Sequence, residues 1–275
     1  LGGVVNEAQG WGRADETFSV QGELAALGRG PQWFALGDKD FGTHIARSHL
    51  LGLGRTLSEV TADLAARHGL PARGVSVLPM SDSPLETHVV VDRGEGPTAI
   101  HFQEWWVRYR AALPAARFVV AGLERATAAP GVVEAIRDAD VVVLPPSNPV
   151  VSIGIILTVP GIREALRETS APVVGVSPII AGKPVRGHAD ACLRAIGLDT
   201  TARAVAGLYA DFLDAWLVDP ADAPAEGEGF GDPDLAHVTV RSLPLVMADP
   251  AAAQRIAAAA LDTAVELQTQ AAGRA

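Results

Sequence analysis

Short apolar runs that alternate with helical segments constrain the fold of this chain more than any other feature. Residues 141–144 and 172–176 are fully apolar, and a helical segment at 152–166 separates them. A predicted strand at 118–121 and a predicted helix at 131–138 precede them. Strands that are apolar on both faces are typical of parallel sheets covered by helices on both sides. The pattern predicts an α/β fold with a mainly parallel sheet.

Residues 75–107 have a different pattern. Three short β-rich runs, 75–80, 87–92 and 99–107, are separated by connections that contain Pro and Gly. Connections this short permit hairpins but are too short for a crossover helix. We therefore expect a small antiparallel extension over residues 75–107.

The first part of the chain reads as helical. Residues 14–27 and 58–68 carry apolar side chains at helical spacing, and a glycine follows each segment. Thr56 and Glu59 match a capping box at the start of the second segment. An Ala-rich helix is expected at the other end of the chain, over residues 251–267.

Charge and cysteine content exclude several classes of protein. The net charge of −10 repels the phosphates of nucleic acids and of anionic membranes, so we expect neither as a partner. The single cysteine, Cys192, forms no internal disulfide and lies in an apolar run, which favours a buried thiol. The sequence has no run of 18 uncharged apolar residues and no signal peptide. These features predict a cytoplasmic protein.

A polar turn follows the predicted strand 141–144. It contains Ser147 and Asn148, and Ser152 lies near the start of the next predicted helix. Pro149 keeps Asn148 out of helical geometry, which stiffens the turn. A helix that starts near Ser152 would direct backbone N–H groups and the positive end of its dipole at a phosphate. The same residues also suit an ordinary helix cap, and both interpretations stay open.

A second polar turn follows the predicted strand 172–176. It begins at Ser177 and leads to Lys183, one of only two lysines in the chain, and to Arg186. Ligands of open parallel sheets bind beyond the carboxyl ends of the strands. If the two strands are neighbours, the turns at Ser147 and Ser177 open side by side onto one anion site. The alternative is an exposed loop with solvated charges.

Two further polar clusters precede the parallel strands. In the first, Asp38 and Asp40 are followed by His44 and Arg47, and a helix starting near residue 42 is expected here. The carboxylates suit magnesium or a substrate hydroxyl, and Arg47 suits a phosphate. The second cluster contains Ser81 and Asp82, for which hairpin geometry alone is a sufficient explanation.

An aromatic run, residues 101–106, is the last notable segment. Strand alternation would place His101, Gln103 and Trp105 on one face and Phe102, Glu104 and Trp106 on the other. Paired aromatic rings of this kind stack on a flat ligand ring, or form part of a core or a dimer contact.

Together, in this order, these segments resemble the CofD family, known in actinobacteria as FbiA. The likeness is carried by Gly10-Trp11-Gly12 with Asp15 and Thr17, Leu36-Gly37-Asp38-Lys39-Asp40 with Thr43-His44, Leu78-Pro79-Met80-Ser81-Asp82, His101-Phe102-Gln103-Glu104-Trp105-Trp106, Ser147-Asn148-Pro149 with Ser152-Ile153, and Val176-Ser177-Pro178-Ile179-Ile180. The resemblance implies a Rossmann-like three-layer sandwich, often dimeric, so a homodimer is expected.

The resemblance also implies an enzyme of coenzyme F-420 biosynthesis. Such an enzyme moves a phosphoenolpyruvyl or phospholactyl group from a guanosine-diphosphate-linked donor to the deazaflavin Fo, releases GMP and requires Mg²⁺. The actinobacterial likeness of residues 106–110 favours the phosphoenolpyruvyl donor. By this likeness, a first group of residues binds substrate and a second is placed at the acceptor or the metal's water shell. The first group is Arg47, Ser81, Asp82, Ser147, Asn148, Ser152, Ser177, Lys183 and Arg186; the second is Asp38, Asp40 and His44.

The family begins with a strand, a glycine-rich loop and metal-binding acidic residues. Leu1-Gly2-Gly3 does not match that loop, so residues 1–275 are interpreted as a single α/β domain that lacks its N-terminal strand and loop. No metal ligand is therefore assigned. A nucleotide-sugar-binding regulator with the same fold is the alternative function. An NAD-dependent oxidoreductase is disfavoured because no GxGxxG follows a strand.

Overall fold

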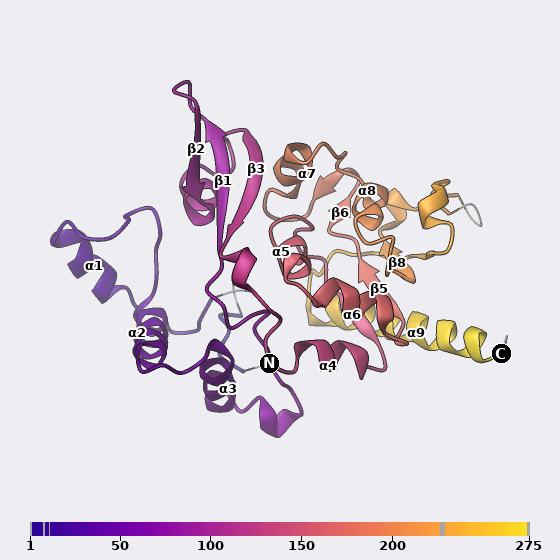
Figure 1. Cartoon of the computed structure of the whole chain (residues 1–275), viewed down its shortest axis with the longest axis horizontal. Coiled ribbons are helices and arrows are strands. Elements are labelled where there is room, and N and C mark those ends of the chain that lie inside the picture. The colour runs from indigo at the N-terminus through magenta and orange to yellow at the C-terminus, as the bar shows by residue number, and fades with distance from the viewer. Residues whose placement is uncertain (1, 8, 11, 226–228, 274–275) are drawn as a thin grey trace. The chain divides into compact units, whose positions relative to one another are not determined.

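The computed structural model describes residues 2–7, 9–10, 12–225 and 229–273. The chain divides into two compact units: Leu1–Pro84 with Thr127–Val132 form unit 1, and Leu85–Ala126 with Val133–Ala275 form unit 2. Figure 1 shows the elements of both. The expectation of one domain over residues 1–275 stays a prediction.

Unit 1 consists mainly of helices in its described residues. These are α1 (Ser19–Ala26), α2 (Asp38–Gly52), α3 (Leu57–Arg67) and the 3-10 helix η1 (Pro71–Arg73). The predicted capping box is confirmed: the Thr56 hydroxyl accepts from the amide of Glu59 at 3.2 Å, and the Glu59 carboxylate accepts from the amide of Thr56 at 2.9 Å. This exchange satisfies two amides at the start of α3.

Two helix boundaries and one predicted strand in unit 1 differ from the sequence prediction. The first helix begins at Ser19 rather than at residue 14, because Asp15 has a φ of +51°, which a helix does not allow. The second begins at Asp38 rather than near residue 42, with Gly37 as its cap. Residues 75–80 form no strand, and Pro79 has no N–H to give to a strand ladder.

Unit 2 contains an antiparallel sheet with strand order β2-β1-β3. The strands are β1 (Glu86–Asp92), β2 (Pro97–His101) and β3 (Ala115–Ala121). The prediction that residues 118–121 belong to the parallel sheet is wrong, because Val89 of β1 pairs antiparallel with Phe118. The antiparallel extension therefore spans residues 86–121 rather than 75–107.

The predicted alternation over residues 99–107 ends at His101. A π-helical turn, η2 (Glu104–Arg108), follows, in which the amide of Tyr109 donates to the carbonyl of Glu104 at 3.1 Å. The helical turn buries Trp105 completely, and its indole N–H donates to the carbonyl of Leu113 at 2.8 Å. Trp105 is therefore a core residue that packs with Val89 and Val91.

The second sheet of unit 2 is parallel, in the order β4-β5-β8-β9. Its strands are β4 (Val142–Leu144), β5 (Val173–Val176), β8 (Ala215–Val218) and β9 (Thr239–Ser242). Every residue of β5 and β8 is buried, as expected for strands covered on both faces. The predicted α/β fold with a mainly parallel sheet is confirmed.

Helices and short elements connect and cover this sheet. They are η3 (Leu123–Arg125), α4 (Val132–Arg137), α5 (Ile153–Thr158), α6 (Ile162–Glu168), β6 (Ile179–Ile180), β7 (Lys183–Pro184), α7 (Ala189–Ala195), α8 (Ala202–Gly207), η4 (Pro220–Asp222), η5 (Pro233–Leu235) and α9 (Pro250–Ala272). None of the helices in the described part of the chain combines the length and apolar character needed to cross a membrane.

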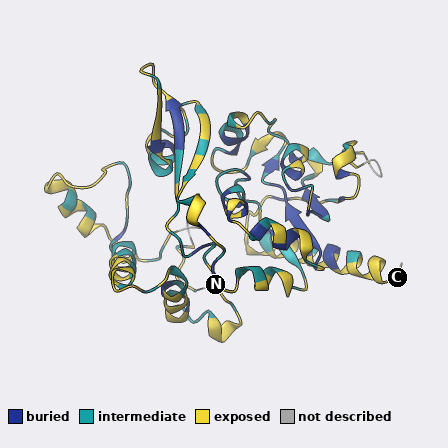
Figure 2. Cartoon of the chain, in the orientation of Figure 1, coloured by how far each residue is buried: buried dark blue, intermediate teal, exposed yellow. Residues whose placement is uncertain are grey.

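The long helix α9 covers one face of the parallel sheet (Figure 1). Ile256, Ala260 and Ala264, four residues apart on one side of α9, pack with Val174 of β5 and Leu217 of β8. Figure 2 shows the buried residues concentrated in these central strands. On the opposite face, the ring of Trp216 lies over Gly175, where a Cβ would come within 2.3 Å of the ring. Both faces of the sheet are thus covered by side chains, so a ligand has room only at the edge where the loops follow the strands.

Candidate functional site

The two polar turns of the sequence follow neighbouring strands. Strands β4 and β5 are parallel, with Leu144 opposite Gly175, so both carboxyl ends lie at the same edge of the sheet. The turn with Ser147 and Asn148 follows β4, and Ser177 directly follows β5. The predicted pairing of the two strands is confirmed. Such an edge is where open parallel sheets bind their ligands.

Asn148 organises the first turn through both ends of its side-chain amide. Its Oδ1 accepts from the amides of Val150 at 2.9 Å and Val151 at 3.1 Å. Its Nδ2 donates to the Sγ of Cys192 at 3.4 Å. Burial raises the pKa of the Cys192 thiol to about 11, so the sulfur is present as a neutral thiol at pH 7. Asn148 therefore shapes the turn.

The three serines at this edge differ in their surroundings. Ser177 is 2% exposed, and its hydroxyl donates to the carbonyl of Ile179 at 3.0 Å and accepts from the same residue's amide at 3.1 Å. Ser147 and Ser152 are half-buried, and neither hydroxyl is hydrogen-bonded to another described residue. Ser177 stabilises its turn, whereas the hydroxyls of Ser147 and Ser152 are available to a ligand.

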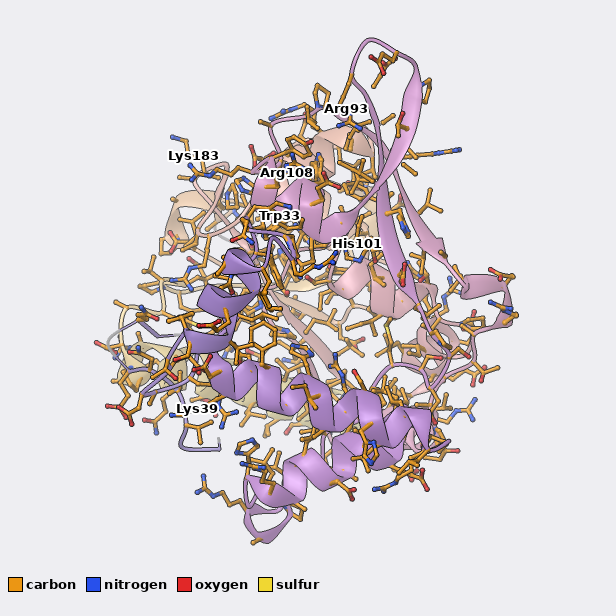
Figure 3. The ribbon with its side chains drawn as sticks, turned by 90° about the vertical axis from the view of Figure 1, so that its left-hand side faces the viewer. Trp33, Lys39, Arg93, His101, Arg108 and Lys183 are labelled. Carbon is orange, nitrogen blue, oxygen red and sulfur yellow. The ribbon has the colours of Figure 1, made fainter. Side chains whose placement is uncertain are left out.

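Lys183 and Arg186 are exposed cations beyond the second turn. Lys183 belongs to β7, which pairs with β6 in a short hairpin, and Arg186 follows three residues later. Figure 3 shows the Lys183 side chain directed outward from its hairpin. Neither cation has a hydrogen bond or ion pair with any residue that the structure describes. Both are therefore available to an anion.

In unit 1, Asp38 acts as a cap for a helix far away in sequence. Its carboxylate accepts from the Thr17 hydroxyl at 2.6 Å, from the Val20 amide at 2.9 Å and from the Ser19 amide at 3.2 Å. These bonds, with the Thr17 hydroxyl first, hold the pKa of Asp38 below its usual value. The carboxylate is thus ionised and engaged with the first amides of α1.

The other members of this cluster also have internal partners. The Asp40 carboxylate accepts from the Gly37 amide at 3.4 Å, which completes the cap of α2. The Nδ1 of His44 lies 2.8 Å from an Arg47 nitrogen. A guanidinium only donates, so Nδ1 is the acceptor and the ring proton is on Nε2. This contact leaves no free lone pair on His44 for general-base chemistry.

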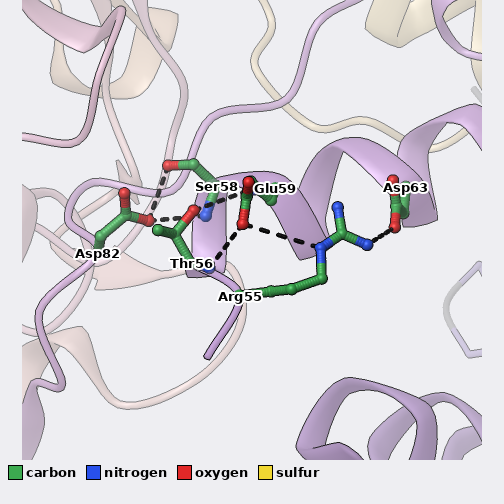
Figure 4. Close-up of polar contacts among 6 residues, drawn as sticks. All are labelled: Arg55, Thr56, Ser58, Glu59, Asp63 and Asp82. Carbon is green, nitrogen blue, oxygen red and sulfur yellow. Dashed lines mark hydrogen bonds and ion pairs between the residues drawn. The ribbon is translucent and has the colours of Figure 1, made fainter. Parts of the chain in front are cut away.

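Ser81 and Asp82 are adjacent in unit 1 and hold local structure, and Figure 4 shows the contacts of Asp82 with Ser58. The Asp82 carboxylate accepts from the amide of Ser58 at 2.6 Å and from its hydroxyl at 2.8 Å, which caps α3. The buried hydroxyl of Ser81 donates to the carbonyl of Thr127 at 2.7 Å. The geometry therefore gives both residues a structural role in their unit.

The described residues form no ready-made cluster of protein ligands for a metal ion. They contain no group of three or more His, Cys, Asp or Glu side chains placed to hold a metal ion. Magnesium prefers oxygen ligands from one or two carboxylates, together with substrate phosphates and water. Asp38 uses both carboxylate oxygens at the start of α1, and Asp82 uses one of its two oxygens at the start of α3.

Sequence reasoning missed one carboxylate at the ligand edge. Asp222 of η4, which follows β8, accepts from the amide of Ala181 at the tip of the β6–β7 hairpin, at 2.8 Å. The residues are 41 positions apart, and nothing in the local pattern joins them. The strand β8 was also missed, although the apolar run 215–218 between two aspartates was a usable signal.

This fold and edge define a class: an α/β protein with hydroxyls and free cations beyond its parallel strands, as in nucleotide- and phosphate-binding sandwiches. The sequence profile of one family, described as "2-phospho-L-lactate transferase CofD", matches residues 17–230. The chain belongs to the CofD family and is a transferase by that membership.

Curated relatives are similar to the chain over nearly all of its length. A "Phosphoenolpyruvate transferase" of Thermobifida fusca is 58% identical over 98% of this chain and 80% of that protein. Proteins of the same name from Streptomyces griseus and Mycolicibacterium smegmatis are 54% and 52% identical, over 98% and 96% of this chain and 82% and 79% of theirs. Protein BH3568 from Bacillus halodurans has a TM-score of 0.55 at 18% identity, over 82% of this chain and 72% of that one, which supports the fold.

Proposed function

We propose that this chain transfers a phosphoenolpyruvyl group, or a phospholactyl group, from a guanosine-diphosphate-linked donor to the deazaflavin Fo. The products are GMP and an F-420 precursor. The relatives' shared name supports the enolpyruvyl donor. One structural observation supports the proposal most: the turns after β4 and β5 begin at the same edge of the sheet, and the segments that follow carry free hydroxyls and two free cations.

The reaction is a substitution at the phosphorus that carries the enolpyruvyl group. A ribityl hydroxyl oxygen of Fo forms the new P–O bond, and the bond from that phosphorus to the oxygen bridging to GMP breaks. GMP leaves with the bridging oxygen and the electron pair, and the hydroxyl proton passes to solvent. Phosphoryl transfer of this kind depends mainly on positioning and charge neutralisation rather than on covalent catalysis.

Each candidate residue has a role that its contacts support. Lys183 and Arg186 neutralise the diphosphate, and the hydroxyls of Ser147 and Ser152 donate to its oxygens or to the ribose. Asn148 and Ser177 keep the two turns in shape. For the acceptor side, Asp40 and Arg47 are proposed, because each keeps polar atoms beyond its one internal contact: Asp40 bonds Gly37 through a single carboxylate oxygen, and Arg47 contacts His44 through a single nitrogen. Asp38, by contrast, uses both of its oxygens at the start of α1.

The proposal includes magnesium as cofactor, a homodimer as the assembly and the cytoplasm as the location. When bound, magnesium would offset negative charge on the diphosphate. No nucleic acid or membrane is proposed as a partner, in keeping with the net charge of −10. Removal of metal with EDTA should abolish turnover, and added Mg²⁺ should restore it.

Product analysis tests the proposal. The purified protein is incubated with Fo, Mg²⁺ and either the guanylylated phosphoenolpyruvate or the guanylylated phospholactate, and the deazaflavin is analysed by mass spectrometry. We expect Fo to gain one phosphoenolpyruvyl group, with stoichiometric GMP. Guanosine nucleotide binding without any product would refute the transferase and support a binding regulator instead.

A further inference from the structure

Residues 179–188 form a segment that we call the cationic arm. It starts after Ser177 at the end of β5, folds back as the β6–β7 hairpin and continues to His188. Ile179 pairs with Pro184, and Ile180 pairs with Lys183, so only Ala181 and Gly182 form the tip. The arm therefore extends from the edge of the sheet where ligands of this fold bind.

The tip of the arm has an unusual conformation for its sequence. Ala181 and Gly182 have φ values of +50° and +72°, which fit a two-residue hairpin turn of type I′. Glycine adopts positive φ readily, but alanine is disfavoured there. The amide of Ala181 donates to the Asp222 carboxylate at 2.8 Å. Asp222 thus stabilises a turn that the sequence of the tip does not favour by itself.

The other end of the arm packs against an aromatic side chain. The ring of Trp106 lies so close to Gly187 that a Cβ there would come within 2.9 Å of it. His188 contacts the same ring edge-on, with ring centroids 5.0 Å apart. Gly187 also has a φ of +78°, so both the space and the backbone require glycine. Trp106 comes from the π-helical turn η2, a type of turn frequent at functional sites.

The arm is fixed at both ends, while its two cations are free. Lys183 and Arg186 are exposed and have no hydrogen bond or ion pair with any residue in the described part of the chain. Other exposed arginines, such as Arg117 and Arg255, also have no partner in the described part of the chain, but Lys183 and Arg186 differ from them in lying beyond the carboxyl end of β5, where ligands of this fold bind. A fixed backbone that presents free cations is preorganised for a phosphate.

We propose that the cationic arm binds the diphosphate of a guanosine-diphosphate-linked donor, and that Asp222 and Trp106 are positioning residues for it. That the anion belongs to this donor rests on the proposed function. That an anion binds here rests on the structure of the arm. Lys183 and Arg186 contact the phosphate oxygens, whereas Asp222 and Trp106 act only through the arm's backbone.

Two substitutions of Asp222 distinguish a role in holding the backbone of the arm from a direct effect of its negative charge on the anion. Asp222→Asn keeps an oxygen that accepts from Ala181 but removes a negative charge, so anion affinity stays the same or rises. Asp222→Ala removes the acceptor as well, so the arm loses its turn and affinity falls. If Asp222 acted only through its charge, both variants would bind anions more tightly, because both remove one negative charge.

The measurement is calorimetric titration of the protein with guanosine 5′-diphosphate. Lys183→Ala and Arg186→Ala should each weaken binding about tenfold, as expected for loss of a charge-assisted bond. Arg255→Ala removes the same charge from an exposed site on α9 and should leave binding unchanged. Asp222→Ala should weaken binding about fivefold to tenfold, and adding Ala181→Asn, which favours the turn, should restore part of it.

Kinetics with the complete reaction give the second readout. Asp222→Ala and Trp106→Leu should raise KM for the donor far more than they lower kcat, and circular dichroism should show both variants folded. If the Lys183→Ala, Arg186→Ala and Asp222→Ala variants of an active enzyme bind guanosine 5′-diphosphate with unchanged affinity, the role of the arm in anion binding is refuted and the transferase activity is not. If these variants weaken nucleotide binding but the wild-type protein forms no product, the transferase activity is refuted and the role of the arm in anion binding is not.

Discussion

Replacement of Asn148 gives the sharpest test of how the first turn is built. Asn148→Ala removes two acceptor bonds, to the amides of Val150 and Val151, and the donor bond to Cys192. Each amide bond contributes roughly 1 kcal/mol, and the thiol bond less, so unfolding free energy should fall by about 2 kcal/mol. Asn148→Asp retains the acceptor oxygen, loses only the bond to Cys192 and places a negative charge at the ligand edge.

The two variants should therefore differ in stability and agree in activity. Urea unfolding followed by tryptophan fluorescence should show Asn148→Ala less stable by about 2 kcal/mol and Asn148→Asp less stable by about 1 kcal/mol or less. Both should lower turnover, alanine by loosening the turn and aspartate by repelling the diphosphate. Normal rates in Asn148→Asp would refute a role for this turn in anion binding. Wild-type stability in Asn148→Ala would refute the hydrogen-bond account.

Two further perturbations test the structure in each unit. Because hydrogen bonds lower the pKa of Asp38 in the folded state, its stabilising effect is full above pH 3.8 and is lost as pH falls through the lowered value. The stability difference between wild type and Asp38→Ala should therefore shrink in acid, and a difference independent of pH would contradict the capping role. Gly175→Ala should cost about 3 kcal/mol, because its Cβ would lie 2.3 Å from the buried ring of Trp216. Adding Trp216→Leu should recover part of that loss in urea unfolding, and no recovery would exclude the clash as its cause.

The sequence predicted the parts of the fold whose signal is local. The apolar runs at 141–144 and 172–176 appear as β4 and β5, since burial on both faces demands that composition. The capping box at Thr56 and Glu59 appears as predicted because both partners lie within one helical turn.

The parts that sequence reasoning missed depend on distant partners. Nothing near Asp38 or Asp82 in the sequence shows that each carboxylate caps a helix 18 to 24 residues away. The segment 118–121 reads equally well as a parallel or an antiparallel strand, and only its register with β1 decides. Ser177 has the right residue type for a ligand contact, but its neighbours bury it and use its hydroxyl. Polar residue types in the sequence thus indicated which edge of the sheet binds ligands, but they did not show which of those side chains have no internal hydrogen bond.

The alanines of α9 have a consequence for how this protein can diversify. Ala260 and Ala264 let the helix backbone approach β5 and β8 closely, so that face of the sheet has no room for a guest molecule. New donor specificity is therefore expected from exchange of side chains in the loops after the strands, while the sheet and α9 change little. A library that randomises the loop at 147–152 and the arm at 179–188 samples the loops after β4 and β5.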